Sequence, residues 1–365
     1  MNNIHDVKNF LLLNKYPKFY LKDRSKQFEF FALGENGNIP HFKLLLQGFD
    51  QHIDNSWKQA IKTTIIPQSV IFKTGENIVE LGCKISEPTP KTSTLYTDMQ
   101  FSEIDLFPNY ELYSKLFNKV KTAINKEELQ KIVLARKRVF SLRGDLNLID
   151  AANYLESNTS NCYIYCICLD SRHYCIGATP ERLFKQSGNV IASEAVAGTA
   201  EKGKDDILNT SKNSHENDLV VQHIVQQMQL ISTNIEISEP YKITPSNISH
   251  LKCDIRGKLK EYLSIEHISG LLHPTPAMAG YPRKEAMNFL EQECFARGLY
   301  SGIFGFEYEK LQEVLVLIRG FFVNNNNLEI YVGSGIVNTS SLEDEWNELN
   351  FKEQLLLNYL QFIKR

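Results

Sequence analysis

The chain has 365 residues, of which 42% are hydrophobic and 23% are charged, a balance typical of a soluble globular protein with a sizeable core. The 40 lysines and arginines against 43 aspartates and glutamates leave a net charge of −3, and no long basic patch is interleaved with aromatic residues, which argues against nucleic acid as a partner. No apolar run approaches the length of a membrane span and the N-terminal stretch does not resemble a signal peptide, so we expect a cytoplasmic protein without membrane contact.

Cysteine usage points to the same compartment. The seven cysteines are an odd number and form no CxxC pair, which favours a reducing cytosol and argues against a zinc site. Cys162, Cys166 and Cys168 share the parity of one strand and are predicted to face the core.

The first 100 residues or so contain short possible strands at 28–34 and 69–75, among Gly, Asn and Pro, and carry no recognisable chemistry. The pattern sharpens after residue 105, where apolar spacing predicts a helix over 109–129 and then a strand over 130–142. The apolar segments 162–169 and 173–178, separated by Asp-Ser-Arg, are typical of a hairpin.

The residues after Pro180 allow two interpretations. A helix capped by Thr179 would place Glu181 favourably in the first turn, but the turn residues Ser-Gly-Asn follow only six positions later. A second hairpin, with arms at 181–186 and 190–200, is therefore predicted. Glu181 then shares a face with Leu183 and points inward, where a carboxyl is costly unless it is protonated or partnered.

The segment 205–232 is predicted to be a helix on which an apolar stripe continues from Glu216, so this carboxylate is either solvated near the helix end or held by a cation. The stripe consists of Leu219, Val220, His223 and Gln227. A strong hairpin follows later, with arms at 313–322 and 328–337 joined through a run of asparagines. Arg319 interrupts its first arm, and Gly333 and Gly335 let the second approach a ligand closely.

The last helix begins after Ser341, a candidate N-cap with Asp344 three residues on. Helical periodicity places Glu345, Glu348 and Lys352 on one face. Taken alone, that face is most simply a solvated surface with a Glu348–Lys352 pair worth a few tenths of a kcal/mol.

Ten segments occur in one order along the chain: KIVLARK (131–137), GATPERLF (177–184), EAVAGTA (194–200), SHENDLV (214–220), ISHLKCDIRG (248–257), LLHPTPAMAGYPRKEAMNFLEQ (271–292), LYSGIFGF (299–306), VLIRG (316–320), YVGSGIV (331–337) and EDEWNELNFK (343–352). Together they resemble the chorismate-utilising enzymes, a family that includes isochorismate synthase, salicylate synthase and the large components of anthranilate and aminodeoxychorismate synthases. The resemblance covers about 105–365.

The resemblance implies the α+β fold class, with extensive antiparallel β-sheet in the core and helices packed outside. It implies a single chorismate-binding domain over 1–365, in which 1–104 is a variable N-terminal part and 105–365 carries the motifs. It also implies a small-molecule substrate, chorismate, and a chain that acts as a monomer.

The motifs are most similar to those of isochorismate synthase, which adds water at C2 of chorismate and expels the C4 hydroxyl. By motif match, Lys131 would be the general base and Glu181 the general acid. Burial favours the uncharged form of both an amine and a carboxyl, so one cavity of low dielectric could prepare both.

The family also uses Mg²⁺ to hold the ring carboxylate. Glu216 and Glu348 match direct ligands, and Glu345 would act directly or through water, a set that suits an ion preferring few carboxylates. Asn213 stands where some relatives carry an acid, so an outer contact of the metal site is lost.

Several further residues match the family's substrate contacts. Arg319 and Lys352 would grip the carboxylates of the substrate, since the fork of arginine suits bidentate binding. The remaining matches are the hydrogen-bonding residues Gly198, Thr199 and Gly333, a ring-lining His250, a pocket aromatic Tyr300, and His273, which could instead brace a proline-stiffened loop.

Three other functions stay open. Salicylate synthase forms isochorismate and then eliminates pyruvate, and one sequence does not separate the two. The loop residues Tyr281, Pro282 and Arg283 differ from the pattern of the ammonia-using relatives. A non-catalytic chorismate-binding module is the third, although decayed copies usually lose acids or bases that are all present here. Isochorismate itself feeds menaquinone, siderophore or salicylate synthesis.

Overall fold

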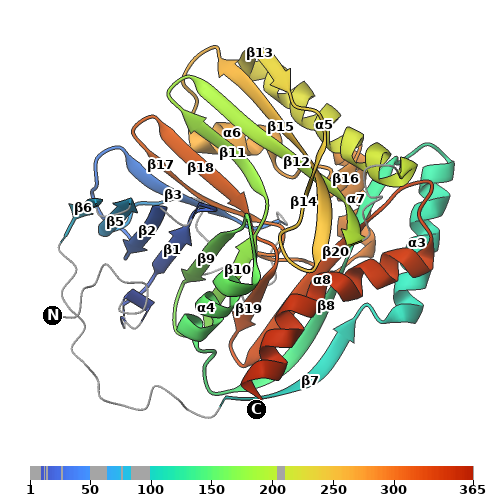
Figure 1. Ribbon diagram of the computed structural model, residues 1–365, viewed down its shortest axis with the longest axis horizontal. Helices are drawn as coiled ribbons and strands as arrows, with labels where there is room; N and C mark the ends of the chain where they lie inside the picture. Colours follow the sequence, from blue (N-terminus) through green and yellow to red (C-terminus); the bar gives the residue numbers. More distant parts are fainter. Residues whose placement is uncertain are drawn as a thin grey trace.

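A computed structural model describes residues 10–11, 13, 15–25, 28–49, 64–74, 77–83, 99–203 and 210–364. Within these residues the strands form two large antiparallel sheets (Figure 1). The first has eleven strands, in the spatial order β16 (Gly280–Tyr281), β8 (Lys131–Arg143), β20 (Asn327–Ile336), β19 (Gly320–Asn324), β10 (His173–Thr179), β9 (Tyr163–Cys168), β1 (Lys18–Lys22), β2 (Phe28–Leu33), β5 (Ser69–Thr74) and β6 (Asn77–Gly82), with β7 (Gln100–Phe107) paired to β8.

The second sheet has nine strands, and helices accompany both sheets. Its order is β13 (Ser232–Ile237), β15 (Ile248–Leu259), β12 (Val190–Glu201), β11 (Arg182–Ser187), β18 (Leu311–Val316), β17 (Ile303–Tyr308), β3 (Phe42–Gln47) and β4 (Thr64–Ile65), with β14 (Tyr241–Ile243) paired to β15. The described helices are α3 (Tyr110–Asn125), α4 (Leu148–Asn158), α5 (Ser211–Ile231), α6 (Ile265–Leu272), α7 (Arg283–Glu293) and α8 (Leu342–Ile363).

Aromatic side chains of both sheets fill the space between them. Phe30 of β2 stacks on Phe306 of β17 with ring centroids 5.2 Å apart, and Phe19 of β1 stacks on Phe304 at 5.7 Å. Helices α4 and α8 bury their apolar faces on the first sheet, and α5 and α6 bury theirs on the second. This layering confirms the predicted α+β class with a sheet core and helices outside (Figure 1).

Two strand pairs continue from one sheet into the other, side by side. β10 of the first sheet leads through Pro180 and Glu181 into β11 of the second, while β18 of the second leads through Leu317–Arg319 into β19 of the first. Two backbone hydrogen bonds join these connections, from Val316 N to the Glu181 carbonyl (3.1 Å) and from Ala178 N to the Arg319 carbonyl (3.0 Å). Arg319 takes a left-handed φ of 58°, which turns the chain at this point.

Tight packing under the paired connections fixes their position. Gly177 and Gly320 face each other in register, and a Cβ on either would lie within about 2.5 Å of the Tyr165 hydroxyl. That hydroxyl donates a hydrogen bond to the Ile318 carbonyl (3.1 Å). Only glycine leaves room for this arrangement, so the bend between the sheets depends on both positions.

Most predicted elements are present, with three differences. The helix predicted to reach residue 129 ends at Asn125, because Glu127 turns left-handed (φ 60°) and Glu128 N bonds back to the Ala123 carbonyl. The arm predicted over 313–322 is wrong as one strand, since it breaks at Leu317–Arg319 and its halves join different sheets. The hairpin arm predicted from 181 begins at Arg182.

The other predicted elements are present, but the helix predicted over 205–232 does not include Thr210, whose backbone is extended. Thr210 caps α5, which begins at Ser211, and residues 205–209 of the predicted helix lie outside the described residues. The cysteines at 162, 166 and 168 are buried in the core as predicted. The division of the domain at residue 104 stays a prediction, although β1–β6 extend both sheets. None of the helices in the described part of the chain has the length and hydropathy that crossing a bilayer requires.

Buried histidines predict how stability depends on pH. His223 of α5 is 3% exposed, its Nε2 has no hydrogen-bond partner among the described residues, and burial lowers its pKa to about 4. Between pH ~6.5, where unfolded histidine titrates, and pH ~4, the unfolded state binds more protons. The free energy of unfolding should therefore fall as the pH falls through this window.

Chemical denaturation at a series of pH values measures this effect. We expect His223→Gln to flatten the dependence by up to about 1.4 kcal/mol per pH unit, while His215→Gln, at an exposed position of the same helix, should leave it unchanged. Equal slopes in the wild type and both variants would contradict the assignment.

Candidate active site

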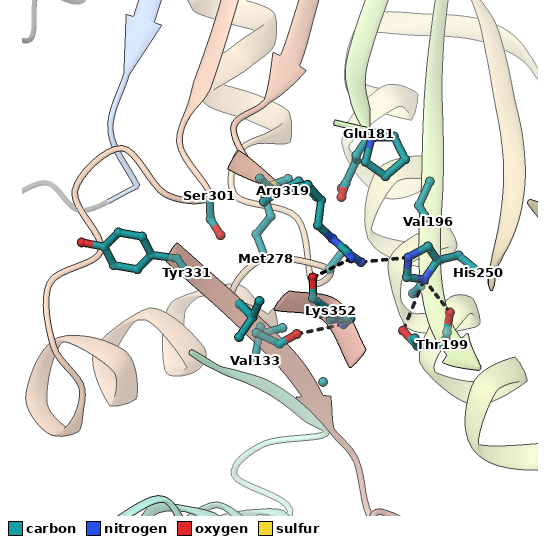
Figure 2. A pocket seen from close by; sticks show the side chains of 18 of the residues that line it. Val133, Glu181, Val196, Thr199, His250, Met278, Ser301, Arg319, Tyr331 and Lys352 are labelled. Carbon is teal, nitrogen blue, oxygen red and sulfur yellow. Dashed lines mark hydrogen bonds between the residues drawn. The ribbon is translucent and has the colours of Figure 1, made fainter. Parts of the chain in front are cut away.

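A pocket lies where the two strand pairs pass between the sheets (Figure 2). Residues far apart in the sequence reach it because β8, β12, β15, β20 and α8 all end or pass beside this point. Of the residues predicted from sequence, the wall contains Glu181, Gly198, Thr199, Glu216, His250, Tyr300, Arg319, Gly333 and Lys352. The other four, Lys131, His273, Glu345 and Glu348, lie behind it.

Glu181 is a buried carboxyl that projects from the connection between the sheets into the pocket (Figure 2). Its backbone N donates to the Thr179 hydroxyl (3.2 Å), which fixes the turn after β10. Burial raises the pKa of Glu181 to about 7, and Glu194 adds to the rise against the opposing effect of Lys131. A carboxyl with this pKa holds a proton in a good part of the molecules at neutral pH, as a general acid must.

Lys131 stands at the start of β8 and is fully buried, with its Nζ 2.9 Å from Glu216 Oε1. The amine has no hydrogen-bond partner among the described residues, so the pair is an ion pair of imperfect geometry. Gly335 of β20 makes the contact possible, because a Cβ there would lie 2.1 Å from Glu216 Oε1 and 2.9 Å from Lys131 Cε. The glycine predicted to allow close approach therefore admits the Lys131–Glu216 pair.

Arg319 is held in the pocket by His250 (Figure 2). Arg319 NH2 lies 3.0 Å from His250 Nε2, and His250 Nδ1 lies 3.1 Å from the Gly198 carbonyl and 3.2 Å from Thr199 Oγ1. Since the guanidinium can only donate, Nε2 accepts and Nδ1 carries the proton. Burial and the nearby Arg319 lower the pKa of His250 to about 3, so this imidazole stays neutral and orients the guanidinium.

The left-handed Gly198 (φ 74°) makes these hydrogen bonds to His250 possible, because β12 bulges between Ala197 and Thr199 against β15. A Cβ at Gly198 would lie 2.9 Å from the Cβ of Asn213 on α5. The bulge turns the Gly198 carbonyl and the Thr199 hydroxyl toward His250, where both lie within hydrogen-bonding distance of Nδ1.

Lys352 of α8 reaches the opposite side of the pocket. Its Nζ donates to the Gly333 carbonyl (2.8 Å) and lies 2.5 Å from Glu348 Oε1, one turn earlier on the same helix. The pair that a solvated helix face would show is thus present but mostly shielded from solvent, with the Lys352 side chain 14% and the Glu348 side chain 10% exposed.

Three acids gather around one ammonium group behind the pocket. Lys212 Nζ lies 2.5 Å from Glu345 Oε1 and 3.9 Å from Glu348 Oε2, and Glu216 also raises its pKa. Glu345 is fully buried and its Oε2 has no hydrogen-bond partner in the described structure. Burial and then Glu348 raise the pKa of Glu345 to about 7, as expected for neighbouring carboxylates.

This arrangement is not a preformed metal cage. Across the described residues, no three His, Cys, Asp or Glu side chains converge as joint ligands. The acids predicted as metal ligands are instead compensated by the ammonium groups of Lys131, Lys212 and Lys352.

His273 and Tyr300 take different positions. His273 Nε2 bonds the Ser301 carbonyl (2.9 Å) behind the wall, which is the bracing role left open from the sequence. Tyr300 lines the pocket and stacks on Tyr331 with centroids 5.2 Å apart. A Cβ at Gly333 would lie 3.0 Å from the Tyr300 hydroxyl, so that glycine gives the ring its room.

Sequence reasoning missed Lys212 and Ser301. Lys212 lies four residues before Glu216 on α5, a helical spacing that could have placed both on one face. Ser301 lines the pocket with a left-handed φ of 61°, a strain that its sequence does not signal.

The fold and the pocket together define an enzyme-like cavity for a small anion, with an acid, an amine and a guanidinium around one space. The family model described as chorismate binding enzyme matches residues 83–361. The chain therefore belongs to the chorismate binding enzyme family, as the order of its motifs indicated.

Individual relatives agree. The chain is 26% identical to the isochorismate synthase MenF of Haemophilus influenzae over 94% of this chain and 86% of the relative, and 32% identical to that of Pasteurella multocida over 65% and 58%. Among solved structures, MenF from Escherichia coli superposes with a TM-score of 0.84 at 22% identity, covering 99% of this chain and 92% of that one. That likeness confirms the fold.

Gly335 offers a direct test of the packing in the site. Gly335→Ala should push Glu216 away from Lys131 and lower the free energy of unfolding by about 1–3 kcal/mol, as overpacking does. Gly270→Ala is the matched control, because its Cβ would meet nothing within 4 Å. Urea denaturation measures the free energy of unfolding of both variants. A Gly335→Ala variant as stable as Gly270→Ala would contradict the close contact of Gly335 with Glu216.

Proposed function

We propose that the chain is an isochorismate synthase that converts chorismate to isochorismate. The observation that carries the proposal is the buried carboxyl of Glu181, with a pKa of about 7, in a pocket that also holds Arg319 and borders Lys131. The isochorismate synthases among the relatives support the choice of reaction. Salicylate synthase is the alternative, since it would use the same residues.

The proposed reaction requires one proton to be removed and one to be delivered. Lys131 must first give up the proton of its ion pair with Glu216. The amine then takes a proton from water while the water oxygen bonds to C2 of chorismate. The two ring double bonds shift, the C4–O bond breaks, and Glu181 donates its proton so that the hydroxyl leaves as water. Atoms balance, because one water enters and one leaves.

The charges of the pocket suit a substrate with two carboxylates. Arg319, oriented by a neutral His250, presents its guanidinium to the cavity, and Lys352 adds a second cation on the α8 side. A fork of N–H donors binds a carboxylate in two contacts and fixes its orientation. The surrounding walls are buried, which strengthens these interactions by excluding water.

We also propose Mg²⁺ as the cofactor, held by Glu216, Glu345 and Glu348. The support is chemical: these acids surround one ammonium, that of Lys212, and Glu345 Oε2 lacks a hydrogen-bond partner in the described structure. Carboxylate oxygens are the ligands that Mg²⁺ prefers. When bound, the ion would neutralise a carboxylate of the substrate. We further propose that the enzyme is cytoplasmic and monomeric, and that its product feeds menaquinone or siderophore synthesis.

Product analysis tests the proposed reaction. Purified protein is incubated with chorismate and Mg²⁺, with and without ammonium, and the products are separated by chromatography. We expect isochorismate alone. Salicylate with pyruvate would favour the alternative, aminated products would indicate an ammonia-using enzyme, and unchanged but bound chorismate would indicate a non-catalytic module.

Lys131→Ala should lower turnover by roughly 10² or more, and near-normal turnover would remove Lys131 from its role.

A change in one acid tests the metal site. Glu348→Gln should weaken Mg²⁺ binding by roughly tenfold or more, judged from the effect of altered metal environments. Titration calorimetry with Mg²⁺ measures this, alongside the Mg²⁺ dependence of turnover. Glu343→Gln, at an exposed position of the same helix, is the control. An unaltered titration for Glu348→Gln would count against this ligand.

A further inference from the structure

The N-terminal part of the chain reaches the back of the pocket through one arginine. Arg24, in the turn between β1 and β2, donates from NH2 to the Pro180 carbonyl (2.6 Å), directly before Glu181. The same guanidinium holds Glu194 of β12 with two bonds, NH1 to Oε1 (2.8 Å) and NH2 to Oε2 (2.5 Å). It thus ties the connection between the sheets to β12.

Glu194 is a buried charge that depends on its partners. Its side chain is 1% exposed, and it also contacts Arg182 NH2 (2.8 Å) and Lys252 Nζ (3.1 Å). Burial would raise the pKa of Glu194, but Arg24, Arg182 and Lys252 lower it, so the carboxylate is ionised. The ring of Tyr163 lies 4.7 Å beneath the Arg24 guanidinium and fixes its plane.

The charge of Glu194 acts on Glu181. The groups around Glu181 are Lys131 of β8, Lys352 of α8, Arg319 before β19 and Glu194 of β12, and only Glu194 among them raises its pKa. Each cation removed from Glu194 leaves more of that negative field uncompensated. Water and salt screen little of the field of Glu194, because the buried pocket wall has a low dielectric constant.

We propose that Arg24 is a positioning residue for the acid, which fixes the Pro180–Glu181 connection and balances the charge of Glu194 behind it. This rests on the proposed role of Glu181 in the reaction. It also gives the N-terminal turn, which carries no recognisable motif, a function in the site. Arg24 touches neither the pocket nor the reacting atoms, so it acts through Glu181 alone.

The pH profile of kcat/KM tests the proposal. Glu181 must be protonated to donate, so activity should fall as the pH rises through its pKa of about 7. Arg24→Met should move this alkaline limb upward by roughly half a pH unit or more and lower kcat by about 10-fold or more because the carboxyl is misplaced. Lys252→Met is the matched control, since Lys252 holds Glu194 without touching Pro180.

The two variants separate charge from position. Lys252→Met should shift the limb in the same direction while kcat stays within about twofold. Arg24→Lys, which keeps the charge but not the three bonds, should restore the limb and recover kcat only in part. It also serves if Arg24→Met fails to fold. Melting temperatures, recorded alongside, report any general loss of stability.

Three results are decisive. A shifted limb with reduced kcat in Arg24→Met supports the proposal. A profile that superimposes on the wild type, with Glu181→Gln inactive, overturns the role of Arg24 and leaves the proposed function standing. Full activity in Glu181→Gln overturns the proposed acid, and with it the role of Arg24.

Discussion

The pair of backbone hydrogen bonds that joins the two inter-sheet connections is the constraint on which the site depends. These bonds make two strand pairs bend together from one sheet into the other. They run from Val316 N to the Glu181 carbonyl and from Ala178 N to the Arg319 carbonyl. The bend places a carboxyl and a guanidinium on backbone that no longer belongs to a regular strand, and therefore beside a cavity. Tyr165, packed under Gly177 and Gly320, leaves the bend no freedom to relax. The sheets on both sides then hold Glu181 and Arg319 in place, as catalysis by orientation would require.

Charge balance is the second condition, because so many ionisable groups are buried here. Glu216 faces Lys131, Glu348 faces Lys352, Glu345 faces Lys212, and Glu194 faces Arg24, Arg182 and Lys252. Glu181 has no ion pair in the described structure, and burial raises its pKa to about 7. Glu345 reaches a similar pKa although it faces Lys212, because burial and the neighbouring Glu348 both raise it. The contrast lies between Glu181 and the acids whose pKa is lowered by paired cations, Glu348 and Glu194, and it separates an acid that can donate a proton from acids that stay ionised.

The sequence predicted local structure well where one element supplied the signal. Periodicity and turn chemistry within a few residues predict the shared face of Glu345, Glu348 and Lys352 on α8. They also predict the capping of α8 by Ser341 and the inward direction of Glu181. It failed where the outcome depended on distant packing. The sequence predicts one strand over 313–322 that Arg319 interrupts, and only the second sheet and Tyr165 explain why the strand ends there. Arg24 meets Glu194, and Lys212 meets Glu345, across long sequence separations that no local pattern predicts. Only the helical spacing of Lys212 and Glu216 was a local signal. The site residues came from the order of motifs, and the structure gathers most of them at one pocket.

The central claim is that Glu181 carries a proton near neutral pH, and infrared difference spectroscopy measures this most directly. A protonated carboxyl has its own C=O band, and Glu181→Gln identifies which part of that band belongs to this residue. Glu345→Gln provides the second reference, since the pKa of Glu345 is also raised to about 7. We expect the Glu181 component to titrate near pH 7. A component that disappears near pH 4.5, the ordinary value for a glutamate, would contradict the account.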